Sequence, residues 1–119
     1  AALEAAGSDS ASESRLREAL NRNPGNAMFN SALARLLSGQ GRWDEAQPFW
    51  FAAHAAAPDQ AAHAYNLAVA LDRLRKAPLA AQYYRKALEL QQGRASAFDV
   101  EAARARLQVL EGAARGGTP

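Results

Sequence analysis

Apolar and small residues recur with the period of an α-helix through the middle of the chain. Residues 61–90 read AAHAYNLAVALDRLRKAPLAAQYYRKALEL. The first half of this segment places apolar residues at the i, i+3, i+4, i+7 spacing of one helical face, at Ala64, Leu67, Ala68 and Leu71. The second half has the same rhythm. The pattern therefore predicts two amphipathic helices, joined by a turn so short that they fold back antiparallel.

The same pattern occurs earlier in the chain. A shift of about 34 residues, the length of a common helical repeat, places Leu67 on Leu33 and Tyr84 on Trp50. A second shift places Trp50 on Leu16. Self-similarity at a fixed period of this size is typical of stacked helical hairpins, each of which buries its apolar faces against its neighbours.

Single helices are predicted on either side of the two hairpins. An apolar stripe from about Ser12 to Arg22 corresponds to the second half of a repeat. Residues 97–110 predict a final helix with its own stripe, and we interpret it as the helix that caps the stack. Residues 1–10 and 113–119 are small and polar, so we expect a disordered arm and a disordered tail.

The turns inside the two hairpins differ in one residue. Gly41 suits the left-handed backbone conformation that often ends a helix. Arg75 stands at the equivalent place in the next repeat. We therefore expect either a strained backbone at Arg75 or a different turn.

Two segments carry a resemblance to a known family. YNLAVAL and AAQYYRKALEL are similar to the tetratricopeptide repeat, a helix–turn–helix unit of about 34 residues. The resemblance covers residues 11–112. It implies an all-α solenoid of antiparallel helix hairpins with two full repeats, an N-terminal half-repeat and a C-terminal capping helix. The positions that carry it are Leu33, Ala34, Leu37, Gly41, Ala46, Trp50, Ala53, Pro58, Leu67, Ala68, Leu71, Ala80, Tyr84 and Ala87.

The resemblance also implies a binding surface. In this family the first helix of each pair lines a concave groove that binds partner peptides. Asn66 matches a family position that often grips the ligand backbone, because its amide both donates and accepts hydrogen bonds. The residues expected to line the groove are Met28, Ser31, Arg35, Tyr65, Asn66, Val69, Asp72 and Arg73.

Two further segments resemble a narrower group of proteins within this family. YNLAVALD and ASAFDVEAARARL resemble repeat domains of bacterial pilus and secretion assembly proteins. The alanine-rich, arginine-rich and lysine-poor composition is typical of a bacterial source. The N-terminus lacks the basic start and apolar core of a signal peptide, and the first residue is not methionine. The sequence leaves the compartment open between bacterial cytoplasm and periplasm.

A second candidate surface is the aromatic run from Phe49 to Phe51. Successive helical residues are about 100° apart, so three in a row span about 200° of the helix. Trp50 takes the core position, and at least one of Phe49 and Phe51 is expected to reach the outside or the next layer of the stack. This patch either contacts a partner or is absorbed by the adjacent helices.

Catalytic, metal and cofactor sites are not predicted. The chain has no cysteine, and its two histidines, His54 and His63, fall on different predicted helices without the spacing of a metal pair. Asp44 and Glu45 lie in a first helical turn, where the helix dipole favours acidic side chains. We therefore predict that the protein is not an enzyme and binds neither a cofactor nor a metal.

The charge and hydropathy of the sequence indicate what kind of partner to expect. Residues 1–60 carry five arginines and seven acidic residues, whereas residues 61–119 carry nine basic and five acidic residues. The basic excess of the second half suits an acidic partner or simply solvates outer helix faces. No apolar run is long enough to cross a membrane, and no nucleic-acid motif is present. The predicted function is a protein–protein interaction scaffold, and the alternative is a homodimerisation module.

Overall fold

The computed structural model describes the backbone of residues 2–95 and 97–116, and the side chains of residues 7–95 and 97–114. Within this part of the chain every regular element is an α-helix, as predicted. The helices are α1 (Ala2–Arg22), α2 (Ala27–Gly39), α3 (Trp43–Ala56), α4 (Ala61–Arg73), α5 (Ala77–Gln91) and α6 (Val100–Gly116).

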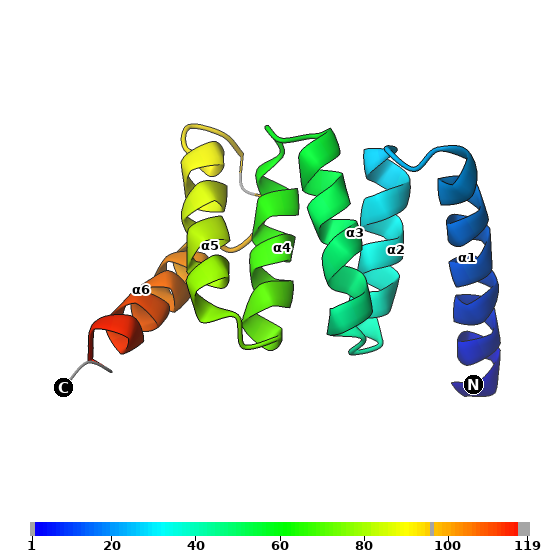
Figure 1. Cartoon of the computed structure of the whole chain (residues 1–119), viewed down its shortest axis with the longest axis horizontal. Helices are drawn as coiled ribbons and strands as arrows, with labels where there is room; N and C mark the ends of the chain where they lie inside the picture. The colour runs from blue at the N-terminus through cyan, green and yellow to red at the C-terminus, as the bar shows by residue number, and fades with distance from the viewer. Residues whose placement is uncertain (1, 96, 117–119) are drawn as a thin grey trace.

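The helices stack in the order of the sequence. Figure 1 shows α1 to α5 side by side in a row, with α6 inclined to α5 at the C-terminal end. Each helix packs mainly on its neighbours in the chain, and α2–α3 and α4–α5 form the two predicted hairpins. The result is an elongated body of about 48 × 30 × 24 Å. No helix among the described residues is long and apolar enough to span a membrane.

The core confirms the repeat register. Leu33 and Leu67, which are equivalent under the repeat, are both fully buried. Ala53 and Ala87 are also fully buried, because a methyl side chain lets the two helices of a hairpin approach closely. Tyr84 occupies the equivalent of Trp50, and both large rings are almost completely buried.

Both ends of the chain differ from the expected boundaries. α1 begins at Ala2, so the segment predicted as a disordered arm is helical from that residue on, and Ser12, where the predicted helix was expected to start, lies inside α1. The helix extends because alanine and glutamate near its start favour helix enough to offset serine and glycine. α6 runs from Val100 to Gly116. Residues 113–116 of the predicted tail are therefore helical, and residues 117–119 lie outside the described residues.

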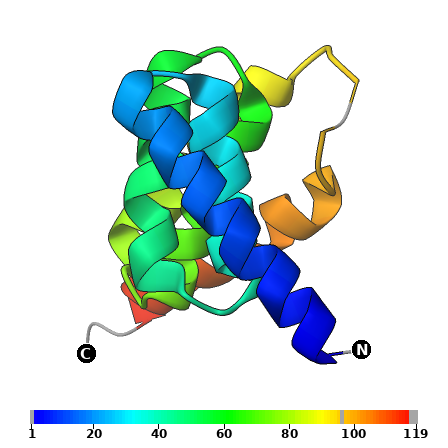
Figure 2. The same ribbon diagram turned by 90° about the vertical axis from the view of Figure 1, so that its right-hand side faces the viewer.

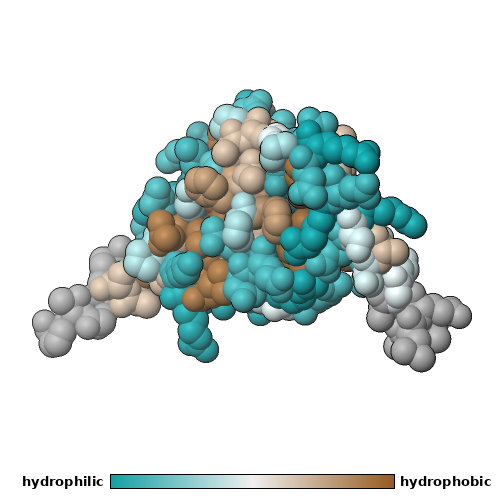
Figure 3. Space-filling view, turned by 45° about the vertical axis from the view of Figure 1, so that its right-hand side comes forward, coloured by the Kyte–Doolittle hydropathy of each residue, from teal (hydrophilic) through white to brown (hydrophobic). Residues whose placement is uncertain are grey.

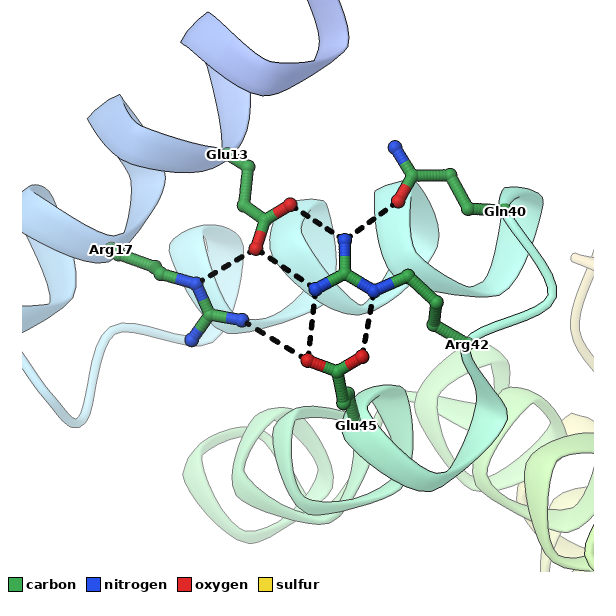
Figure 4. Close-up of polar contacts among 5 residues, drawn as sticks. All are labelled: Glu13, Arg17, Gln40, Arg42 and Glu45. Carbon is green, nitrogen blue, oxygen red and sulfur yellow. Dashed lines mark hydrogen bonds and ion pairs between the residues drawn. The ribbon is translucent and has the colours of Figure 1, made fainter. Parts of the chain in front are cut away.

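α1 is joined to the first hairpin by a charged network (Figure 4). The Arg42 guanidinium donates from Nη1 to Glu13 Oε1 at 2.7 Å and from Nε to Glu45 Oε2 at 2.7 Å. Arg17 donates to the same Glu13 carboxylate at 3.0 Å, and Gln40 accepts from Arg42. Hydrogen bonds from Arg42 and then Arg17 lower the pKa of Glu13. This network ties α1 to the turn between α2 and α3.

The two hairpin turns share a left-handed backbone at equivalent positions. Gly41 has φ = 74° and Arg75 has φ = 61°. The first alternative considered for Arg75, a strained backbone, is therefore the one found. Glycine adopts this conformation freely, whereas a side chain with a Cβ atom is strained by roughly 1–2 kcal/mol.

Replacing Arg75 by glycine is expected to stabilise the protein. The gain should be about 0.5–1 kcal/mol, because the relief of backbone strain exceeds the extra flexibility of glycine in the unfolded chain. Thermal and urea unfolding measure it. The matched control is Gly41→Ala, which should destabilise by a similar amount. A lower melting temperature for Arg75→Gly would contradict this account of the turn.

Candidate functional site

A hollow of about 300 Å³ lies where α2, α3 and α4 meet. Two indole rings, a polar amide and an arginine surround it, and both of the chain's tryptophans are among them. We call it the tryptophan hollow. Its lining residues are Arg35, Ser38, Gly39, Trp43, Trp50, Asn66 and Val69.

The tryptophan hollow has a rigid wall. Trp50 is 3% exposed and donates from Nε1 to Ser38 Oγ at 3.0 Å, so its ring is fixed by packing and by a hydrogen bond. The Arg35 guanidinium lies over the Trp50 ring, 5.9 Å from its centroid. The Arg73 guanidinium lies over the Trp43 ring, 5.5 Å from the ring centroid. Both arrangements are cation–π contacts.

A second hollow, of about 390 Å³, lies between α4 and α6. Val69 lines both hollows and separates them. We call this the tyrosine hollow, and we call the two hollows together the groove. The tyrosine hollow is lined by Tyr65, Val69, Asp72, Arg73, Tyr84 and Arg106.

The polar groups of the tyrosine hollow are engaged within the chain. Asp72 accepts two hydrogen bonds from Arg106, at 2.7 and 2.8 Å, and a third from the Tyr84 hydroxyl at 3.1 Å. Arg106 first, and Tyr84 after it, lower the pKa of Asp72, while burial and the neighbouring carboxylate raise the pKa of Tyr84. The Tyr65 ring is stacked on Phe98, with 4.4 Å between centroids. α6 and its linker therefore occupy much of this hollow.

The residues expected to line the groove fall into three groups. Arg35, Asn66 and Val69 line the tryptophan hollow, and Arg73 lines the tyrosine hollow while covering the Trp43 ring. Tyr65 and Asp72 lie in the tyrosine hollow and contact the C-terminal part of the chain. Met28 and Ser31 line neither hollow.

The two α2 residues outside the hollows have different surroundings. Met28 is 73% exposed at the start of the helix. Ser31 is buried, and its hydroxyl donates to the Met28 carbonyl at 3.1 Å. The Ser31 hydroxyl is thus used inside its own helix.

Sequence reasoning missed the two tryptophans as groove residues. The sequence pattern placed Trp50 only in the core, and it assigned Trp43, the first residue of α3, to neither candidate surface. Their faces line the hollow because the short turn after α2 brings the start of α3 beside α4. The sequence signal for the contact of Trp43 with Arg73 is a tryptophan at the start of the second helix of one hairpin and an arginine at the end of the first helix of the next.

The aromatic run divides as its helical spacing requires. Phe49 is half-buried beneath the Arg17 guanidinium, 5.5 Å from its ring centroid, and so packs toward α1. Phe51 is 49% exposed on the surface of α3.

His54 is buried at the contact between the two hairpins. Its ring meets Tyr83 edge-on, 5.7 Å between centroids, and Nδ1 has no hydrogen-bond partner among the described residues. Burial lowers its pKa, with smaller effects from Lys86 and His63, and burial also lowers the pKa of His63. The described residues contain no group of side chains that would hold a metal ion.

The lowered pKa values of His54 and His63 predict that stability falls in mild acid. Their folded-state pKa values lie below the unfolded value of about 6.5. Below that pH the unfolded chain takes up protons that the folded chain excludes, so the free energy of unfolding decreases as pH falls from 6.5. Urea unfolding at pH 7.5 and 5.5 measures the loss. His54→Gln should reduce the pH slope, and an unchanged slope would contradict this role of His54.

Comparison with known proteins identifies the fold. No family model and no curated protein sequence matches the chain. Among solved structures, the Sgt2 TPR domain from Aspergillus fumigatus superposes with a TM-score of 0.73 at 23% identity, over 99% of this chain and 78% of that one. The MamA RS-1 ArsTM double mutant gives a TM-score of 0.67 at 19% identity, over 98% and 72%. By the helical hairpins of its described residues and by these neighbours, the chain has the tetratricopeptide-repeat fold.

Proposed function

We propose that this chain is a protein–protein interaction scaffold that binds an extended segment of a partner protein in the groove. The observation that carries the proposal is the state of Asn66. Its amide is half-buried in the tryptophan hollow and forms no hydrogen bond within the described part of the chain. Such an amide offers a donor and an acceptor to a passing peptide backbone.

The side chains around Asn66 suit the binding of a peptide rather than the catalysis of a reaction. The partly exposed Trp43 and Val69 provide apolar area, and the arginines at the rim provide donors. Rigid aromatic and arginine side chains are the residues that most often dominate protein interfaces. An affinity in the micromolar range, about −8 kcal/mol, suits so small a surface.

The test compares matched variants in binding. The domain is immobilised and used to recover a partner from bacterial lysate, where the resemblance to pilus and secretion assembly domains directs the first search. The recovered partner is then titrated against wild type, Asn66→Ala and the control Asn21→Ala, which changes an exposed asparagine on α1. Asn66→Ala should weaken binding about tenfold, and the control should not.

Amide chemical shifts locate the contact independently. We expect the bound partner to perturb the groove residues around Asn66 and Val69. Perturbations confined to Phe49, Phe51 and their neighbours, with a silent groove, would refute the groove proposal.

The second candidate function is homodimerisation, and the exposed Phe51 favours it. On the face seen in Figure 3, hydrophobic side chains form separate patches among hydrophilic ones. Solution mass at micromolar concentration tests this candidate. A dimer that becomes monomeric in Phe51→Ser would support it, and a monomeric wild type would exclude it at that concentration.

A further inference from the structure

The two arginines beside the tryptophan hollow differ from most other arginines of the protein. Arg42 and Arg106 each bind a carboxylate of the chain at 2.7 Å. Arg85 likewise pairs with Glu111. Arg35 and Arg73 form no ion pair within the described residues, and each instead lies over an indole ring. Arg35 lines the tryptophan hollow and Arg73 covers one of its rings from the tyrosine hollow, so the groove has two guanidinium groups without an ion-pair partner among the described residues.

The contacts with the indole rings leave the edges of these two guanidinium groups available to bind an anion. A guanidinium that covers an aromatic face keeps the N–H groups at its edge available, and these are the donors that bind a carboxylate in a forked geometry. The ring beneath also excludes water from one side, which strengthens the interaction with an anion. Arg35 and Arg73 are therefore prepared to bind a carboxylate.

The neighbouring surface specifies what accompanies the carboxylate. Val69 and the partly exposed Trp43 form an apolar area beside the two arginines. Asp72, on the far side of Val69, already has Arg106 as its partner and would repel a second acidic group. An acidic residue at the tryptophan hollow thus fits best with an uncharged apolar neighbour toward the tyrosine hollow.

We infer that the tryptophan hollow recognises the side-chain carboxylate of an internal aspartate or glutamate, flanked by an apolar residue, in an extended peptide. The carboxylate binds Arg35 and Arg73, and the apolar residue packs on Val69. Both hollows are open and adjoin at Val69, so a chain can continue through the groove in either direction. This inference rests on the proposed groove function and adds the ligand's chemistry to it.

Three probe peptides test the inference, each acetylated and of the same length. The first has one glutamate between two leucines and an amidated C-terminus. The second replaces the glutamate by glutamine, and the third keeps glutamine but has a free C-terminal carboxylate. The readout is the pair of indole N–H resonances, since both tryptophans of the chain line the hollow.

The glutamate peptide should shift both indole resonances and bind about tenfold more tightly than the glutamine peptide. Arg35→Gln and Arg73→Gln should remove this preference. Arg15→Gln is the control, because it deletes the same charge at an exposed site on α1. The preference should also shrink as salt is raised, since the arginines are solvent-accessible.

The other outcomes each overturn a different statement. If the glutamate and glutamine peptides bind equally, or if neither shifts the indole resonances at millimolar concentration, the inferred recognition of an acidic side chain is wrong. The groove proposal is tested separately, by Asn66→Ala and the recovered partner. If the free-carboxylate peptide binds more tightly than the glutamate peptide, the site reads a chain terminus and not a side chain. If Arg15→Gln also abolishes the preference, the effect is general electrostatics.

Discussion

Replacing Leu67 by alanine is expected to lower the free energy of unfolding by about 2–5 kcal/mol. Leu67 is fully buried at the centre of α4, where it belongs to the core formed by both hairpins. The substitution removes three heavy atoms from a site whose neighbours belong to several helices, so the cavity cannot close by moving one element. Urea unfolding and the melting temperature measure the loss.

Leu79→Ala is the matched control for this cavity. The same chemical change is made on α5, but Leu79 is 46% exposed, so water fills the space and the loss should be well below 1 kcal/mol. Equal losses for the two variants would mean that the core does not depend on the repeat register described above.

Removing residues 97–119 is expected to abolish cooperative unfolding or to cause aggregation. α6 buries Ala103, Leu107 and Leu110 against the rest of the stack, so its loss exposes the apolar face of α5. It also removes Arg106 and leaves the Asp72 carboxylate without its cation. Circular dichroism during heating and the solution mass of the fragment report the outcome.

Deletion of residues 1–10 is the comparison for this truncation. The described side chains in this segment, residues 7–10, are exposed or only partly buried, and the charged contacts of α1 begin at Glu13. We expect only a small change in the melting temperature. If the fragment without residues 97–119 is soluble and keeps the sharp transition of the full chain, α6 is not a capping helix.

The sequence predicted the hairpins well because their cores obey a strict period. Leu33, Leu67 and the alanines of each hairpin repeat at one spacing, and helical periodicity then fixes which face is buried. A strict 34-residue period would place Glu101 at the core position of Leu67, so a buried stripe in α6 requires a linker longer than the period. The burial of Ala103 and Leu107, with Glu101 exposed, agrees with that shift.

The contacts that long side chains make near the turns could not be predicted from the sequence. Whether Arg106 reaches Asp72 depends on the path of the linker after α5, which the buried Gln91 fixes by bonding to the backbone at Arg94 and Ala97. No local pattern encodes that path. The partly filled tyrosine hollow and the indole contacts of Arg35 and Arg73 also depend on this path and on side-chain geometry. The sequence therefore predicted candidate groove residues, but it could not separate those that bind other parts of the chain from those that are free to bind a partner.

Because each helix packs mainly on its sequence neighbours, the fold has few interactions between distant parts of the chain. Low contact order of this kind is associated with folding in microseconds to milliseconds. Opening should then begin at α1 and α6, which lie at the two ends of the row and each pack mainly against one neighbouring helix. Backbone amides of α3 and α4 would exchange with solvent most slowly, which places the tryptophan hollow on the last part of the protein to unfold.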